Sequence, residues 1–282
     1  MFFAESLGNP KLDVLDLKAI SKAAQTYKVP FIVDNTVATP FLLNPIEHGA
    51  NIVIHSLTKY IGGNGTSLGG VIIDAGNFDW SNGKFPEFTE PSAGYHGLKY
   101  YEVLGPASFI AKVRIEGLRD LGASLSPFNA FQIIQGLETL AIRIKKHSEN
   151  ALELAKWLQK RSEVAWVNYP GLISSKYYDL AQQYLPEGQS GIVTFGLKGG
   201  YESAKKVADE TQFFSLLANI GDTKSLIIHP ASTTHQQLSE EQQITTGVTK
   251  DLIRLSVGLE DIEDLKADLQ GVLEKLPVQN LV

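Results

Sequence analysis

Residues 51–59 of the chain read Asn-Ile-Val-Ile-His-Ser-Leu-Thr-Lys, so that a short apolar run ends in polar side chains and a lysine, Lys59. Residues 31–36 repeat this pattern, because Phe-Ile-Val is followed by Asp34, Asn35 and Thr36. A buried parallel strand has this pattern, and it delivers polar side chains at its C-terminal end. The two runs therefore predict neighbouring parallel strands whose polar ends face the same crevice.

The neighbouring segments extend this pattern into a sheet. Between Asp13 and Tyr27 apolar residues recur at helical spacing, with Asp13 and Asp16 at the expected start, where carboxylates suit the unpaired amides and the helix dipole. A glycine-rich segment at 62–65 and a third apolar run at 71–73 follow Lys59. This order of helix, strand, strand, glycine loop and strand predicts an α/β sheet with its site along one edge.

The second half of the chain predicts a separate domain. Residues 74–105 lack periodicity, which indicates a long and largely irregular segment. At Ser126-Pro127, a serine cap and a proline at the first helical position predict a long helix that reaches about Lys160 and joins two domains. We expect part of a large α/β domain at 1–126 and, at 127–282, this helix with a smaller α+β domain. Its strands are expected at 164–169, 192–195, 226–228 and 252–257, and its helices at 201–209 and 262–276.

Composition limits the classes of function. The 282 residues include no Cys, carry a net charge of −6 and contain no cluster of Lys or Arg. These properties argue against nucleic acid and anionic membrane surfaces as partners, and they exclude disulfides, thiolate nucleophiles and Cys-ligated zinc. No apolar run is long enough for a membrane span, and the start has no signal-peptide pattern. We expect a cytoplasmic protein whose partners are small molecules or other proteins.

Asp34 and Lys59 would face one crevice if their strands are neighbours. A carboxylate at a strand end can pair with a pyridinium N–H, and a lysine beside it can form an imine with an aldehyde. Ser56 and Thr58 are two hydroxyls suited to donate to a phosphate. Each feature alone also has a structural interpretation, because Asp34-Asn35 can be a strand-to-turn signal and residues 56–59 a helix cap with a solvated lysine. The occurrence of these features together favours the interpretation as a binding site over the structural one.

Other chemistries lack their companion residues. No His-Glu-x-x-His pair occurs, and His229 and His235 do not share a helical face, so no metal site is expected. Residues 63–69 match neither the dinucleotide-binding glycine pattern nor the phosphate-binding loop of nucleotide hydrolases. Residues 56–59 match the Ser-x-x-Lys of serine acyl-enzymes, but Ser-Asp-Asn and Lys-Thr-Gly are absent. A non-catalytic remnant that kept the fold is a further hypothesis.

Several motifs are distributed along the chain, at 5–10, 33–36, 56–60, 125–130, 136–140, 168–171, 229–235 and 254–260. Together they resemble the Cys/Met-metabolism enzymes that depend on pyridoxal 5′-phosphate (PLP), and the resemblance covers essentially the whole chain. The resemblance implies a fold-type I, aspartate aminotransferase-like architecture, with Lys59 as the lysine that holds PLP as a Schiff base and moves protons. It implies that Asp34 pairs with the pyridine nitrogen, Asn9 lies near the phenolic oxygen, Ser56 and Thr58 bind the phosphate, and Arg254 binds the substrate α-carboxylate.

Within this family, residues 77–105 and 217–222 look most like the O-acetylhomoserine sulfhydrylases, since the lyase branches usually have Ser where this chain has Asn219. The resemblance implies conversion of O-acetyl-L-homoserine and sulfide to L-homocysteine and acetate in methionine biosynthesis, with Asn219 in the substrate site. Cystathionine γ-synthase and the methionine or cystathionine γ-lyases are the alternatives, because they share the cofactor residues. The family builds its sites across a homodimer and usually forms homotetramers.

The chain departs from the family pattern in its extent. Family members normally begin well before this sequence, and we expect roughly the first third to be absent. That part would supply phosphate-binding amides, an aromatic ring stacked on the pyridine, and residues donated to the neighbouring subunit, so we expect this polypeptide alone to bind PLP poorly. A smaller departure is Asn64, where relatives commonly have His.

Overall fold

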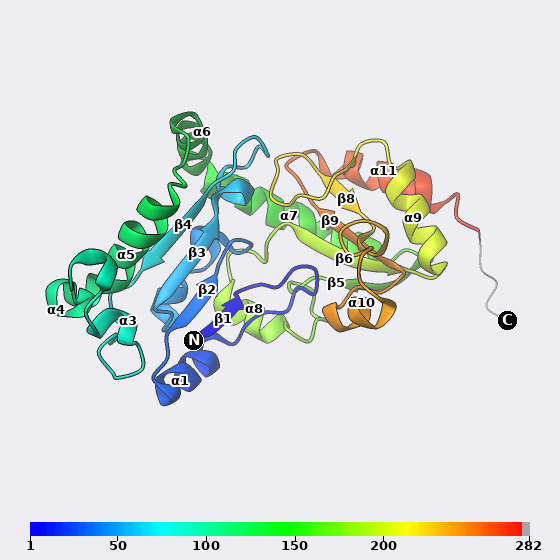
Figure 1. Ribbon diagram of the computed structural model, residues 1–282. Coiled ribbons are helices and arrows are strands. Elements are labelled where there is room, and N and C mark those ends of the chain that lie inside the picture. Colours follow the sequence, from blue (N-terminus) through cyan, green and yellow to red (C-terminus); the bar gives the residue numbers. More distant parts are fainter. Residues whose placement is uncertain (278–282) are drawn as a thin grey trace.

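A computed structural model describes residues 1–277, which form two β-sheets separated along the chain by residues 75–163 (Figure 1). The first sheet has the strand order β1-β2-β3-β4, in which β1, β2 and β3 run parallel and β4 runs antiparallel to β3. Its strands are β1 (Phe2–Glu5), β2 (Phe31–Asp34), β3 (Ile52–Ser56) and β4 (Gly70–Asp74).

The three predicted strands of this sheet are confirmed, and β1 is a strand that the sequence pattern did not predict. In the observed register Glu5 lies beside Asp34, and Asp34 lies beside Ile54. The C-terminal ends of β1, β2 and β3 therefore meet at one edge of the sheet. This edge is where the polar residues after each apolar run were expected.

Helix α1 (Leu17–Tyr27) packs its buried residues Leu17 and Ala24 into the core that also holds Phe31 and Val53. The helix begins at Leu17 rather than near Asp13, because the side chain of Asp16 accepts a 3.1 Å hydrogen bond from the backbone amide of Ala19. Such a cap satisfies an amide that has no partner within the helix. A short helix, α2 (Thr39–Leu42), follows β2.

Residues 74–126 cover another part of the first sheet. Up to Gly105 this segment is largely irregular, as predicted, and it contains the short helices α3 (Pro86–Thr89) and α4 (Tyr100–Leu104). An unpredicted helix follows, α5 (Ser108–Lys112), and helical turns continue through 113–120. Trp80 stacks on Phe109 with ring centroids 5.3 Å apart, and Trp80 belongs to a core cluster that includes Ile32 and Ile52.

The predicted linking helix is two helices, α6 (Pro127–Glu138) and α7 (Leu140–Leu158). They are separated at Thr139, whose φ of −105° and ψ of 1° are not helical. Ser126 precedes Pro127 as predicted, but its side chain makes no capping hydrogen bond, so the expected serine cap was wrong. Because Leu140 and Ile144 of α7 belong to the first core and Leu154 to the second, the domain boundary at 126/127 stays a proposal.

The second sheet has the order β5-β6-β9-β8-β7 and is antiparallel except for the pair β7 and β8. Helices α7, α9 and α11 contact one another or its strands and share its core. The predicted strands and helices are confirmed, with α11 ending earlier than expected; β7, α8 and α10 were not predicted. The elements are β5 (Val164–Asn168), α8 (Tyr178–Tyr184), β6 (Ile192–Leu197), α9 (Gly200–Glu210), β7 (Ser215–Leu216), β8 (Leu226–Ile228), α10 (Glu240–Thr246), β9 (Leu252–Ser256) and α11 (Ile262–Leu273).

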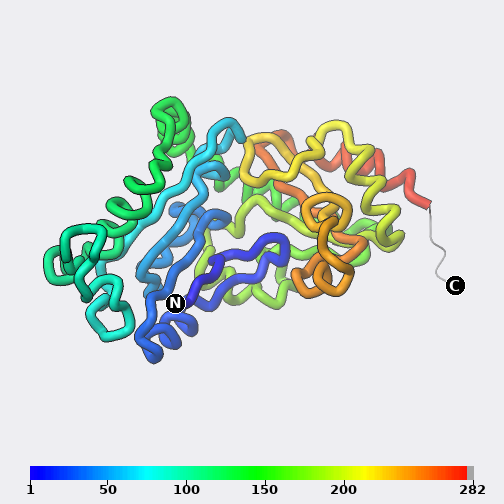
Figure 2. Tube along the Cα trace, in the orientation of Figure 1, coloured from blue at the N-terminus to red at the C-terminus, as the bar shows by residue number. Residues whose placement is uncertain are grey.

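The loop after β1 contacts the segment around α10, although the two are far apart in the sequence. Figure 2 shows the N-terminal loop after β1, in blue, beside the orange segment that contains α10. The Lys11 ammonium donates a 2.7 Å hydrogen bond to the carbonyl of Thr245. Over residues 1–277, none of the helices has both the length and the apolar character that crossing a membrane requires.

Candidate functional site

The structure brings four of the predicted site residues together by hydrogen bonds. Asn9 follows β1, Lys59 follows β3, Asn219 lies between β7 and β8, and Arg254 lies in β9. The Lys59 Nζ donates to Asn219 Oδ1 at 2.6 Å. Arg254 donates from Nη2 to the Asn219 carbonyl at 3.0 Å and from Nη1 to Asn9 Oδ1 at 3.3 Å. The site therefore lies where the C-terminal edge of the first sheet meets β9 of the second.

Residues 57–61, which we call the lysine turn, place Lys59 at this junction. The turn is closed by hydrogen bonds from the Gly62 amide to the Leu57 carbonyl at 2.9 Å and from the Gly63 amide to the Lys59 carbonyl at 2.8 Å. Lys59 itself has non-helical torsions, with φ of −91° and ψ of −131°. Burial lowers the pKa of Lys59, and the positive charge of Arg254 lowers it further. A larger fraction of this amine is therefore unprotonated at neutral pH than for an exposed lysine.

Arg254 is a cation without an ionic partner. Among residues 1–277, none of the ion pairs includes Arg254, and its buried Nε has no hydrogen-bond acceptor. Burial lowers its pKa to about 10. A buried charge is costly unless it is paired, so the site favours an anionic ligand next to this guanidinium.

Asp34 and Ser56 lie at the ends of adjacent strands and are linked through Thr36. The Thr36 amide donates to Asp34 Oδ1 at 2.9 Å, and the Thr36 hydroxyl accepts from the Ser56 amide at 2.8 Å. Asn35 has a structural role instead, because its buried amide group bonds to the Ser6 hydroxyl and to two backbone carbonyls. Both residues therefore support the strand-to-turn interpretation, because Asp34 accepts from the backbone two residues ahead and Asn35 bonds to carbonyls of the following turn. Asp34 also stands at the end of β2, where the predicted site lies.

The two predicted phosphate ligands differ in the structure. Within the described chain the Ser56 hydroxyl makes no hydrogen bond, and it is not buried. The Thr58 hydroxyl accepts from the Gly69 amide at 3.1 Å and donates to the Gly69 carbonyl at 3.3 Å. Thr58 therefore closes the glycine-rich segment against the lysine turn. To donate to a ligand, the Thr58 hydroxyl would have to break its hydrogen bond to the Gly69 carbonyl.

Sequence reasoning missed Arg143 and His147 of α7, which lie directly behind the lysine turn. Arg143 donates to the carbonyls of Tyr60 and Ile61, at 2.7 and 3.1 Å. His147 packs edge-on against the Tyr60 ring, with centroids 5.3 Å apart. The sequence does contain a signal for them. Arg143 and His147 are four residues apart and alternate with the apolar residues Leu140 and Ile144, which is the spacing of the buried face of a helix.

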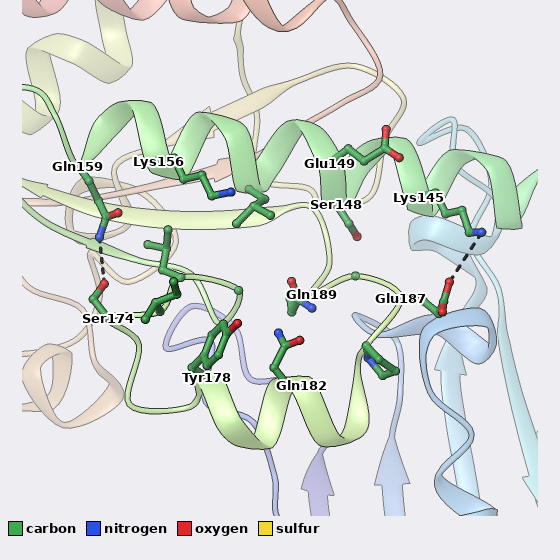
Figure 3. A pocket seen from close by; sticks show the side chains of 16 residues that line it. Lys145, Ser148, Glu149, Lys156, Gln159, Ser174, Tyr178, Gln182, Glu187 and Gln189 are labelled. Atoms are coloured by element: carbon green, nitrogen blue, oxygen red, sulfur yellow. Dashed lines mark hydrogen bonds and ion pairs between the residues drawn. The ribbon is translucent and has the colours of Figure 1, made fainter.

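A second hollow in the molecule lies away from this site. It is an open groove of about 880 Å³ between α7 and α8, and none of the predicted site residues lines it (Figure 3). Its polar side chains bond to one another, as in the ion pair of Lys145 with Glu187 at 3.8 Å and the hydrogen bond from Gln159 to Ser174 at 3.0 Å. In residues 1–277 no group of three His, Asp or Glu side chains is arranged to hold a metal ion.

Comparison with known proteins identifies relatives along nearly the full chain. Residues 1–274 match the family model described as Cys/Met metabolism PLP-dependent enzyme. The O-acetyl-L-homoserine sulfhydrylase of Leptospira meyeri is 56% identical, over 98% of this chain and 64% of its own length. O-acetyl-L-homoserine sulfhydrylase 1 of Thermus thermophilus is 50% identical, over 96% of this chain and 65% of its own length. The chain thus spans just under two thirds of the length of these relatives.

A solved structure agrees with this relationship. The crystal structure of a Campylobacter jejuni protein named as an O-acetylhomoserine (thiol)-lyase superimposes with a TM-score of 0.93 at 48% identity. The match covers 97% of this chain and 65% of that one, which contains a pyridoxyl-lysine monophosphate residue. The fold is therefore the α/β fold of these PLP enzymes, with a part of the large domain followed by the second sheet. The chain belongs to the Cys/Met metabolism PLP-dependent enzyme family.

Proposed function

We propose that the chain carries the core of an O-acetylhomoserine sulfhydrylase site, which replaces the acetate of O-acetyl-L-homoserine with sulfide to give L-homocysteine. The names of the two bacterial relatives support this assignment, as does a 48% identical homocysteine synthase from Schizosaccharomyces pombe. The observation that carries the proposal is the connected set Lys59, Asn219, Arg254 and Asn9. Lys59 supplies an amine of lowered pKa, which a lysine-bound cofactor requires. Arg254 supplies an unpaired cation for the carboxylate of an amino-acid substrate.

The residues at the sheet edge fit PLP. Lys59 offers an amine to the aldehyde, Asp34 offers a carboxylate oxygen to the pyridine nitrogen, and Ser56 has a hydroxyl with no partner in the described chain. Thr58 would assist Ser56 with the phosphate, and Asn9 would lie near the phenolic oxygen. When bound, PLP supplies an electron sink that stabilises negative charge developing on the substrate carbons. Asp34 supports this role because a carboxylate favours the protonated pyridine.

Arg254 would bind the substrate α-carboxylate. Its guanidinium is held by Asn9 and by the Asn219 carbonyl, both neutral acceptors, so its charge is not compensated. A carboxylate that replaces these acceptors gains two parallel charge-assisted hydrogen bonds. This exchange orients the amino acid with its α-carbon toward Lys59.

Lys59 would then move protons at the substrate carbons. The Asn219 Oδ1 accepts a hydrogen bond from the Lys59 Nζ at 2.6 Å, but it does not neutralise the ammonium charge, because an amide oxygen is a neutral acceptor. The lowered pKa of Lys59 assists proton removal, since a general base works best when its pKa lies near the working pH. Asn219 bonds to both Lys59 and Arg254, which supports its proposed place in the substrate site.

Product analysis tests the reaction. The protein supplied with PLP is incubated with O-acetylhomoserine and sulfide, and in parallel with methionine and with cystathionine. Because this polypeptide alone is expected to bind PLP poorly, PLP is supplied in large excess, and the turnover that occurs should give homocysteine and acetate as its main products. O-succinylhomoserine as a parallel substrate defines the acyl preference. Dominant release of methanethiol from methionine, or dominant cleavage of cystathionine, would instead assign one of the lyases. Borohydride reduction followed by peptide mass spectrometry should place the pyridoxyl group on Lys59, and Lys59→Ala is the control.

We also propose that the protein works in the cytoplasm as a homodimer or homotetramer. Exposed apolar side chains on α6 support self-association, because Phe128 is 81% exposed and Phe131 is 62% exposed. Sedimentation velocity of the purified protein tests this, and a monomer at micromolar concentration contradicts it.

A further inference from the structure

One face of α7 carries three buried polar side chains, Arg143, His147 and Asn150. All three are at most 8% exposed, although helix faces turned to a core are normally apolar. No carboxylate pairs with Arg143 among residues 1–277. The three side chains instead donate to backbone carbonyls of segments that lie far away in the sequence.

Arg143 binds the lysine turn. Its Nη1 donates to the Tyr60 carbonyl at 2.7 Å, and its Nη2 donates to the carbonyls of Ile61 at 3.1 Å and Gly136 at 2.6 Å. Its Nε donates to the Thr139 hydroxyl at 3.0 Å. The carbonyls of a helical turn lose their donors where the turn ends, so the guanidinium supplies the donors that Tyr60 and Ile61 lack.

The chain leaves room for this contact at Gly63. Gly63 has a φ of +73°, and a Cβ atom there would lie 2.4 Å from Arg143 Nη1. A glycine at this position therefore permits both the left-handed backbone and the close approach of the guanidinium. The fork of Arg143 can reach four acceptors at once, whereas a lysine ammonium has three donors on one atom.

The same face of α7 binds the end of β9. The His147 ring bonds through Nδ1 to the Val257 carbonyl at 2.6 Å. The Asn150 amide donates to the carbonyls of Gly258 at 3.0 Å and Glu260 at 2.9 Å. These residues follow Arg254 on the same strand, so α7 is bonded both to the segment that carries Lys59 and to the segment that carries Arg254.

We propose that α7 sets the position of Lys59 relative to Arg254, with Arg143 as the positioning residue for the lysine turn and His147 and Asn150 as those for β9. This inference rests on the roles proposed above for Lys59 and Arg254. Arg143 touches neither a reacting atom nor the cofactor-binding side chains, so it acts through the backbone of Tyr60 and Ile61. Loss of its contacts should let the lysine turn relax toward water.

The experiment measures the Lys59 amine directly, without substrate or PLP. The full chain is labelled with trace acetic anhydride at a series of pH values, and mass spectrometry follows the peptide that contains residue 59. The variant is Arg143→Lys, which keeps the positive charge but cannot span four acceptors. The control is Arg161→Lys, the same replacement at another little-exposed arginine, whose partners are Glu163 and Glu274. A milder variant, Thr139→Val, removes the acceptor of Arg143 Nε, together with the hydrogen bond from the Thr139 hydroxyl to the Gly136 carbonyl.

In Arg143→Lys we expect the midpoint pH of Lys59 labelling to rise by about half a unit or more, because a more hydrated lysine moves toward its ordinary pKa. Thr139→Val should shift the midpoint in the same direction by less, and Arg161→Lys should leave it unchanged. The proposal is overturned if Arg143→Lys and Thr139→Val lower the melting temperature but leave the Lys59 midpoint at the wild-type value. If Arg143→Lys does not fold, Thr139→Val decides alone. Failure of the proposed reaction does not alter this result, because no turnover is measured.

Discussion

The Nζ of Lys59 and the Oδ1 of Asn219 are 2.6 Å apart, although the two residues are separated by 160 positions in the chain. The acceptor is neutral, so the contact orients the ammonium without compensating its charge. Arg254, which donates to the Asn219 carbonyl, adds a second positive charge nearby. Lys59 is therefore held in a fixed place by Asn219, while burial and then the charge of Arg254 keep its pKa low.

Asn219→Asp should raise the pKa of Lys59, because a carboxylate at hydrogen-bond distance favours the ammonium form. Such a partner shifts a pKa by about 1–3 units. At pH 7 to 8 less of the amine is then free, so attachment of PLP should be slower and should recover as the pH is raised. The rate of the absorbance change after PLP addition, measured against pH, checks this. Asn64→Asp is the control, since Asn64 is exposed and bonds only to the Gly62 carbonyl; an equal shift there would point to a general charge effect.

Arg254→Met should abolish the reaction without lowering the melting temperature. Burial of an unpaired guanidinium opposes folding, and an apolar side chain of similar length removes that cost. Arg143→Met is the matched comparison, because Arg143 is also buried without a carboxylate but satisfies several carbonyls. Each carbonyl left without a donor costs about 1–3 kcal/mol, so we expect a clear loss of stability there. Calorimetry of both variants checks the contrast, and equal destabilisation would contradict it.

The protein should lose stability in mild acid through His147. Burial lowers the pKa of this histidine from 6.5 to about 4. As the pH falls from 6.5 toward 4, the unfolded chain binds a proton that the folded protein does not, so the free energy of unfolding decreases. The full difference is about 3 kcal/mol. His147→Asn keeps a donor for the Val257 carbonyl but has no titration in this range. Urea unfolding at pH 7 and pH 4.5 should show a smaller loss in the variant than in the wild type, whereas equal losses would assign the effect to other groups.

Gly221→Ala should displace the lysine turn. Gly221 has a φ of +72°, and a Cβ atom there would lie 2.6 Å from the Tyr60 amide nitrogen. Gly200→Ala is the control, because Gly200 has a φ of +64° but no atom near its Cβ position. Backbone strain alone costs about 1–2 kcal/mol, so the control should lose that much stability. Gly221→Ala should lose more and should also change the pH dependence of Lys59 labelling, which the control should leave intact.

The sequence predicted the parts of the site that depend on short apolar runs. The runs at 31–33 and 52–54 form β2 and β3. Their register places Asp34 beside Ile54, near the end of β3 that precedes Lys59. The run around Arg254 became β9. These predictions succeeded because continuous apolar residues bounded by polar ones are typical of buried strands, whatever their partners.

Other parts of the site depend on tertiary contacts that local patterns do not encode. The helix is interrupted at Thr139, which is neither a proline nor a glycine. At this interruption the Arg143 side chain donates to the Thr139 hydroxyl and to the Gly136 carbonyl. The role of Arg143 was not evident because a helix arginine is usually solvated. Likewise, β1 consists of four residues at the start of the sequence with no helix or turn signal before it.

Arg254 and Asn9 are 245 residues apart, and this separation determines when the site can exist during synthesis. A ribosome makes the chain from its N-terminus, so the lysine turn leaves the exit tunnel long before β9 has been translated. Until then Lys59 lacks both Asn219 and Arg254, and its amine has the reactivity of any exposed lysine. The selective capture of an aldehyde that we propose for Lys59 therefore begins only after β9 has been translated and the second sheet has docked.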